Sequence, residues 1–145
     1  MPQPGVPYII AVAQHPHMVM DSSENPHERR KVIIYNKHGR TNQQWQLYPA
    51  ENGAYSIVNV ANQGTLEIPN HSHGQQGTHV HVSQPNRTIN EQWHIQPVGN
   101  GVAIKSAYNQ MALNVSGGSM ENDADVIIYP FEGRHNDIWA FFPAM

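Results

Sequence analysis

Three copies of one short motif decide the fold: Asn42-Gln43-Gln44-Trp45, Asn90-Glu91-Gln92-Trp93 and Asn136-Asp137-Ile138-Trp139. The three tryptophans are 48 and 46 residues apart, and each is followed four residues later by a proline. A fixed spacing of this size indicates an internal repeat in which each copy is one supersecondary unit. The 145-residue chain is therefore predicted to be a single domain, residues 1–145, with repeats at about 7–50, 54–98 and 101–143.

Each unit is predicted to contain four short strands. In the second unit, alternating and β-branched residues indicate strands at 55–60, 65–68, 78–83 and 93–96, with turn residues between them. An apolar run before each Trp marks the third strand of its unit: Val32-Ile33-Ile34-Tyr35, Val80-His81-Val82-Ser83 and Val126-Ile127-Ile128-Tyr129. No window keeps a period of 3.6 residues, so helix content is expected to be near zero.

Strands this short cannot stand alone, because a small open sheet leaves its edges unpaired. Three four-stranded units would suit propeller blades, but a propeller needs about four or more of them. A closed barrel of six strands, two from each unit, capped by three hairpins, removes the exposed edges. The repeat therefore predicts an all-β fold, a β-trefoil with pseudo-threefold symmetry.

Composition excludes several classes of protein. Only 13% of residues are charged, the net charge is −3, and there is no cysteine. Without clustered Lys and Arg no nucleic-acid partner is expected, and without cysteine there is no disulfide or thiolate chemistry. No apolar run approaches the length of a membrane span, so no membrane insertion is expected. No secretory signal is visible either, and a cytoplasmic location is the expectation.

The triplicated Gln-x-Trp frame resembles the ricin B-chain-like (R-type) β-trefoil lectins from Tyr8 to Phe142. The first unit, with its opening at 4–10 and its tail at 35–45, is similar to the cysteine-free mushroom members. The resemblance implies a non-catalytic lectin for galactose- or N-acetylgalactosamine-type glycans, with a defence role. It also implies that the Trp packs in the core and that the Gln holds a neighbouring turn. Sugar recognition therefore depends on other aligned positions of the three repeats.

A shallow sugar site needs an acceptor for adjacent hydroxyls, a ring to cover the apolar face of the sugar, and an amide that both donates and accepts. In the first unit the resemblance places these groups at Asp21, Tyr35 and Asn42, once an extra residue in the turn at 14–17 is allowed for. The complete candidate site is Asp21, Tyr35, His38, Gly39, Asn42 and Gln43. The alternative is structural: Asp21 caps a turn and Tyr35 covers the barrel wall.

The other two units carry fewer of these groups. The third has the neutral Asn114 in the acidic column, which makes weaker hydrogen bonds than a carboxylate. A weaker second site is expected there, at Asn114, Tyr129, Asn136 and Asp137. The second unit has Glu67 and Asn90 but Ser83 in place of the aromatic ring, so it is predicted not to bind sugar.

Two pairs of histidines, His71-x-His73 and His79-x-His81, suit a metal site because residues i and i+2 of a strand share a face. The alternative is that they lie on a solvated face and in a loop. No third ligand is placed nearby, so neither a metal nor any other cofactor is expected. Protonation of the ten histidines would turn the net charge of −3 positive, and ligand binding or association is expected to weaken in acid.

Two further functions share the fold class, since fold does not determine function. A β-trefoil protease inhibitor would block a protease cleft with its loops, and a structural or toxin-targeting module would have lost sugar binding. Asp123 and Asp125 have no converging partner carboxylates by sequence, so an enzyme is not expected. A single shallow site is weak, and several sites or a homodimer would supply avidity.

Overall fold

Twelve strands form one sheet in the computed structural model, which describes residues 2–28 and 30–144. The first unit contributes β1 (Tyr8–Val12), β2 (His15–Ser22), β3 (Val32–Asn36) and β4 (Trp45–Pro49). The second contributes β5 (Tyr55–Asn59), β6 (Thr65–Glu67), β7 (His81–Ser83) and β8 (Trp93–Val98). The third contributes β9 (Gly101–Ser106), β10 (Ala112–Val115), β11 (Ala124–Tyr129) and β12 (Trp139–Pro143).

The first and fourth strands of the three units close into a barrel. Long antiparallel ladders join β4 to β5, β8 to β9 and β12 to β1. Single pairs complete the ring at equivalent places: Tyr8 with Trp45, Tyr55 with Trp93 and Val102 with Trp139. The expected six-stranded barrel of a β-trefoil is confirmed, and every barrel edge is paired.

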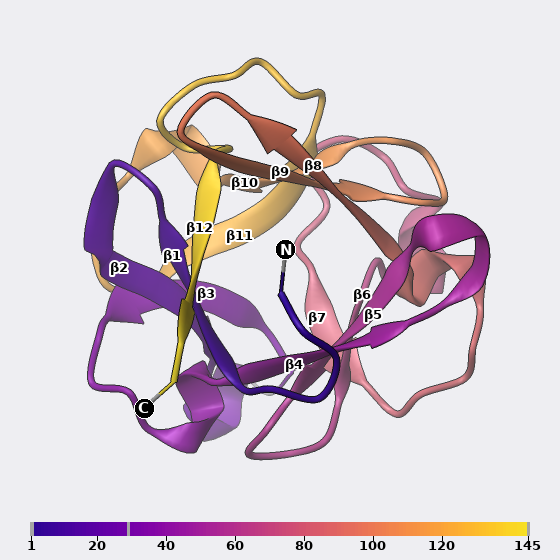
Figure 1. The fold of residues 1–145 in the computed structure, drawn as a ribbon, viewed down its shortest axis with the longest axis horizontal. Coiled ribbons are helices and arrows are strands. Elements are labelled where there is room, and N and C mark those ends of the chain that lie inside the picture. Colours follow the sequence, from indigo (N-terminus) through magenta and orange to yellow (C-terminus); the bar gives the residue numbers. More distant parts are fainter. Residues whose placement is uncertain (1, 29, 145) are drawn as a thin grey trace.

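The second and third strands of each unit form hairpins that cap one end of the barrel. Figure 1 shows the three units as three lobes around a central axis, coloured indigo to purple, magenta to pink, and orange to yellow. The caps meet through three equivalent contacts between neighbouring units: Lys31 with His81, His79 with Ile127, and Asp125 with Ile33. Here Lys31 Nζ lies 2.6 Å from Asp125 Oδ1, and this contact raises the pKa of Lys31.

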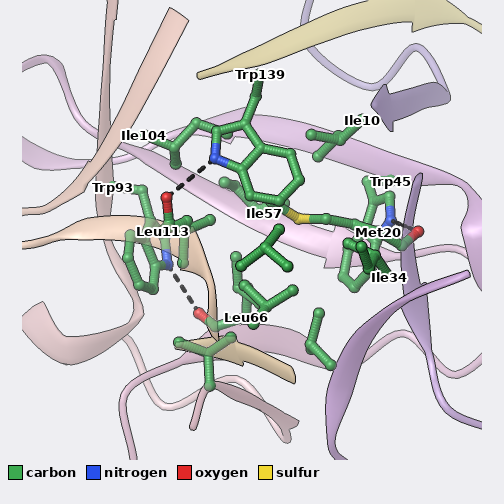
Figure 2. Close-up of a cluster of buried hydrophobic side chains, with 14 of the residues drawn as sticks. Ile10, Met20, Ile34, Trp45, Ile57, Leu66, Trp93, Ile104, Leu113 and Trp139 are labelled. Atoms are coloured by element: carbon green, nitrogen blue, oxygen red, sulfur yellow. Dashed lines mark hydrogen bonds between the residues drawn. The ribbon is translucent and has the colours of Figure 1, made fainter. Parts of the chain in front are cut away.

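The core lies inside the barrel and beneath the caps. Trp45, Trp93 and Trp139 are fully buried, as the repeat predicts. Each indole Nε1 donates to a carbonyl oxygen of the second strand in its own unit, at 3.2, 3.0 and 3.0 Å, as Figure 2 shows. The accepting residues are Met20, Leu66 and Leu113. The bond leaves the indole with no unpaired donor and fixes where the hairpin sits on the barrel.

Two details differ from the sequence predictions. The structure has no α-helix among the described residues, but six three-residue 3-10 turns interrupt the chain, two of them just before Trp45 and Trp93. The third strand of the second unit was predicted at 78–83, and β7 is only His81–Ser83. The backbone N–H of Val80 donates to Val126 of the third unit at 3.0 Å, so this stretch pairs across the unit boundary rather than within its hairpin. No helix in the described part of the chain is long and apolar enough to cross a membrane.

The position occupied by Ile33 and Ile127 in the other units is His81 in the second. Burial lowers the pKa of His81 below its ordinary 6.5, with the neighbouring histidines and Lys31 acting in the same direction and Glu67 opposing them. The unfolded chain therefore takes up this proton at a higher pH than the folded chain. The contribution of neutral His81 to stability is fully present above about pH 6.5 and is lost as pH falls through the lowered pKa.

We expect the melting temperature to fall between pH 7.5 and pH 5, and His81→Ile to reduce that dependence because it restores the apolar residue of the other two units. Thermal unfolding followed by circular dichroism at several pH values measures it. His27→Gln, at an exposed position, is the matched control and should keep the wild-type slope. An unchanged slope in His81→Ile would contradict the assignment.

Candidate functional site

The residues that align with Asp21 in the other two repeats occupy the equivalent position on their hairpins. Asp21, Glu67 and Asn114 each directly follow the residue whose carbonyl accepts the indole N–H of the same unit. The extra residue of the first unit is absorbed before this point, where the pairing of β1 with β2 shifts register between Ala11 and Val12. The bond from the buried Trp45 to Met20 therefore fixes the place of Asp21 on the hairpin surface.

A hollow of about 370 Å³ opens over the β2–β3 hairpin of the first unit. Four of the six predicted residues line it: Asp21, Tyr35, His38 and Asn42. Sequence reasoning missed the remaining lining residues, which are Ser23, Glu24, Asn25, Ile33, Arg40 and Asp123. Asp123 comes from the β10–β11 hairpin of the third unit, and no motif spacing indicates that approach.

Gln43 does not line the hollow and is fully buried beneath it. Its Oε1 accepts from the backbone N–H groups of His38 and Gly39 at 2.9 and 3.1 Å. Its Nε2 donates to Asp21 Oδ2 at 2.9 Å and to the Asn36 carbonyl at 3.0 Å. Gln43 and the Gly39 backbone thus hold the loop and the carboxylate in place, with every polar atom of the Gln43 side chain already used.

The residues at the position of Gln43 in the other two repeats hold the equivalent turn. Glu91 accepts from the backbone N–H groups of Asn86 and Arg87, and Asp137 accepts from those of Glu132 and Arg134. Each of these side chains is buried.

Asp21 is the buried charge of the site, with only 3% of its surface exposed. Asn42 Nδ2 donates to its Oδ1 at 3.1 Å, and His38 Nε2 lies 3.9 Å from its Oδ2. Burial raises the pKa of Asp21 above its ordinary 3.8, while the hydrogen bond from Gln43 and the nearby His38 oppose that rise. A carboxylate kept in a desolvated place costs stability, and such groups cluster at functional sites.

Asn42 leaves one acceptor free. Its Nδ2 is committed to Asp21 and, at 3.4 Å, to the Ser22 carbonyl, whereas its buried Oδ1 has no hydrogen-bond partner in the described structure. A buried acceptor without a donor is costly.

Tyr35 and His38 form the aromatic side of the hollow. Their ring centroids are 6.3 Å apart with an interplanar angle of 57°, so the half-buried Tyr35 ring is not covered by the imidazole. His38 Nδ1 accepts from the backbone N–H of Arg40 at 3.0 Å. The neutral imidazole then carries its proton on Nε2, on the side of Asp21, where it is a donor.

The third unit has a hollow of about 450 Å³ lined by three of the four predicted residues, Asn114, Tyr129 and Asn136. Asp137 is buried beneath it and serves the turn. Asn136 Nδ2 donates to Asn114 Oδ1 at 3.3 Å, the counterpart of the Asn42–Asp21 contact. Residues missed by the sequence reasoning also line this hollow: Ser116, Gly117, Gly118, Ile127, Glu132, Arg134 and His135.

The second unit has the same backbone arrangement as the first-unit site but lacks its aromatic side chain. Asn90 Nδ2 donates to the Ile68 carbonyl at 2.8 Å, and Ser83 stands where the other units have Tyr35 and Tyr129. Among residues 2–28 and 30–144 no group of three or more His, Asp or Glu side chains is arranged to hold a metal ion. His79 Nε2 instead lies 3.4 Å from Asp125 Oδ2 at the meeting of the caps.

Residues 3–83 and 41–129 match the family described as ricin-type beta-trefoil lectin domain-like. The chain belongs to this family. Membership in a ricin-type lectin family supports carbohydrate binding as the function of the chain. A comparison with curated proteins gives no match.

Solved structures of known lectins and of a designed protein share the ricin-type fold. The designed threefold-symmetric protein ThreeFoil is 26% identical over 93% of this chain and 96% of its own, with a TM-score of 0.85. The Macrolepiota procera ricin B-like lectin, solved with lactose, is 20% identical over 97% of both chains, with a TM-score of 0.82. The Polyporus squamosus lectin, solved with a sialylated influenza-binding epitope, is 22% identical, with a TM-score of 0.82. The alignment with it covers 97% of this chain and 50% of that lectin.

Proposed function

We propose that the protein is a non-catalytic lectin that binds glycans ending in galactose or N-acetylgalactosamine, with its main site in the first unit. One observation carries the proposal: the buried Asp21 carboxyl, whose pKa is raised, lies in the same hollow as Asn42 and the Tyr35 ring. The likeness to a fungal lectin solved with lactose supports the choice of a galactoside.

Each group has a distinct role in this proposal. Asp21 accepts hydrogen bonds from two adjacent sugar hydroxyls, and a charged acceptor makes the stronger bond. Asn42 Oδ1 accepts from a hydroxyl, and the N–H of His38 Nε2 donates to a ring substituent. The Tyr35 ring covers the apolar C–H face, which is most continuous in galactose-type sugars. Gln43 is a positioning residue that acts through Asp21 and the loop at His38 and Gly39.

A binding role fits the carboxylates of the site better than hydrolysis does. Glycoside hydrolysis needs two carboxyl groups held at a fixed separation across the bond. Of the carboxylates that line the hollow, Asp21 is buried, whereas Glu24 and Asp123 are exposed. The proposal extends to a weaker second site at Asn114, Tyr129 and Asn136, to avidity through a homodimer, and to a cytoplasmic defence role.

Tyr35→Ala is expected to weaken binding of methyl β-galactoside about tenfold, because the sugar loses its stacking surface, worth about 1.5 kcal/mol. Tyr129→Ala, at the equivalent position of the third unit, is the matched control and should change affinity less. Titration calorimetry on both variants measures the difference. Equal effects of the two substitutions would contradict the assignment of the main site to the first unit.

A glycan array with the wild-type protein separates the proposed function from its rival. Binding to galactose-terminated glycans is the expected result. Silence on the array, together with inhibition of a papain-like or trypsin-like protease, would favour the β-trefoil protease inhibitor instead.

A further inference from the structure

A second hollow adjoins the first-unit site. It has a volume of about 440 Å³ and lies between the first and second units. Ser23, Glu24 and Asn25 line both hollows, so these three residues form a shared ridge between them. The opposite wall comes from the second unit, where Asn62, Gln63 and Gln84 line it.

The lining of this hollow is polar and largely uncharged. Its amides, at Asn25, Asn62, Gln63 and Gln84, each carry both a donor and an acceptor, as a hydroxyl-rich ligand requires. Glu24 on the ridge and Arg30 at the far side carry opposite charges, so the hollow has no net charge to attract an ion. The buried Val82 gives a small apolar floor. This chemistry suits a neutral sugar ring better than an apolar or strongly charged ligand.

Internal hydrogen bonds hold both walls before any ligand arrives. On the ridge, Asn25 N–H donates to Ser23 Oγ at 3.2 Å, and Asn25 Oδ1 accepts from the His27 N–H at 2.9 Å. Across the hollow, Asn62 Nδ2 donates to Ser22 Oγ at 2.9 Å, which ties the second unit to the first. A wall that is already fixed loses little conformational freedom on binding.

The boundary between the second and third units carries a larger side chain than the boundary between the first and second. Val60 and Ala107 make the same backbone bond, to Gln44 and Gln92 respectively, so the residues that follow them, Ala61 and Tyr108, are equivalent. At the boundary of the second and third units Tyr108 lies against Gly74, where an added Cβ would be 2.7 Å from the ring. A cavity of about 170 Å³ lies there, lined by Tyr108 together with Thr88 and Asn90. The corresponding residue at the first boundary is the small Ala61, which directly precedes Asn62 in the wall of the hollow.

We propose that this inter-unit hollow binds the second sugar of a glycan whose terminal galactose occupies the first-unit site. The ligand class is then a galactose-terminated disaccharide or longer oligosaccharide, read by two adjacent subsites, rather than a single sugar. Glu24 and Asn25 on the ridge contact both residues of the glycan. This inference rests on the proposed function, because it assigns the second subsite relative to the first.

The test compares methyl β-galactoside with three galactose-terminated disaccharides, lactose, N-acetyllactosamine and melibiose, by calorimetric or NMR titration. In the wild-type protein at least one disaccharide should bind about tenfold more tightly than the monosaccharide. Gln84→Trp, which fills the hollow from its second-unit wall, should remove that gain and leave methyl β-galactoside affinity unchanged. Gln84→Ala should reduce the gain without filling the hollow, and Gln96→Ala, exposed on β8, is the control.

The outcomes are distinct. Equal affinity for the monosaccharide and all three disaccharides, or a gain that survives both Gln84→Trp and Gln84→Ala, would overturn the second subsite and leave the first intact. Failure of the wild-type protein to bind methyl β-galactoside or any of the disaccharides would overturn the proposed function itself. Unchanged methyl β-galactoside affinity in the variants also shows that they are folded.

Discussion

Asp21→Asn is expected to weaken galactoside binding by at least about tenfold, because hydrogen bonds to a charged group contribute about 1.5–3 kcal/mol. The substitution removes the charge and keeps the shape, and Asn is the residue that the third unit already carries at this position, as Asn114. The fold is therefore expected to survive. Titration with methyl β-galactoside at pH 7.5 measures the loss.

The stability of the same variant is expected to change little. Removal of a buried charge is favourable, but one of the two oxygens that accept from Asn42 and Gln43 becomes an amide nitrogen and loses that hydrogen bond. Burial raises the pKa of Asp21 above its ordinary 3.8, so the unfolded chain releases this proton at a lower pH than the folded chain. The stabilising contribution of the group is present below about pH 3.8 and is lost as pH rises through the raised pKa. Asn does not ionise and avoids the desolvation of a buried charge.

A loss of binding with little change in stability distinguishes a functional carboxylate from a structural one. If Asp21 only caps a turn, Asp21→Asn should lower the melting temperature and leave sugar affinity alone. The raised pKa also implies that wild-type binding fails in acid at a higher pH than an ordinary carboxyl would cause. Asp123→Asn, at an exposed carboxylate on the edge of the same hollow, is the control and should retain most of the affinity.

Trp93→Ala is expected to lower the free energy of unfolding by about 3–5 kcal/mol, the usual cost of removing a large buried aromatic side chain. The substitution also leaves the Leu66 carbonyl without the indole donor that lies 3.0 Å away. Native domains are stable by only about 5–15 kcal/mol, so the variant should be close to unfolding at body temperature. Urea denaturation followed by circular dichroism measures the change.

Two comparisons make the result specific to the buried indole. Trp93→Phe keeps most of the apolar volume and loses the hydrogen bond, so a smaller cost is expected. Ile89→Ala, at a side chain that is 50% exposed, should change stability little. If Trp93→Ala costs no more than Ile89→Ala, the indole does not support the barrel as described.

The sequence was sufficient to predict the barrel and four of the ten residues that line the first-unit hollow. Trp45, Trp93 and Trp139 recur at a fixed spacing because each fills the same place in one threefold core. Asp21 and Tyr35 lie on paired strands of one local hairpin, so their proximity follows from strand register. Asn42 precedes the buried Trp45 in a short 3-10 turn, which returns its amide to Asp21.

Contacts between units were beyond the reach of the sequence. Asp123 reaches the first-unit hollow from the third unit, and Asn62 reaches Ser22 from the second. Such contacts depend on how the three caps meet, and no spacing along the chain encodes that. The short β7 has the same cause, since Val80 bonds across the unit boundary. Asp137 holds a turn, as the resemblance implies for the Gln of the Gln-x-Trp frame, although it was also included in the predicted second site.

The most direct measurement of the central claim is an NMR titration of the wild-type protein with methyl β-galactoside, read at the backbone amides. The account predicts that the largest shift changes fall at Asp21, Tyr35, His38 and Asn42, with smaller changes at Asn114 and Asn136. No saturable shift change at any of these residues, or changes confined to the second unit, would contradict it.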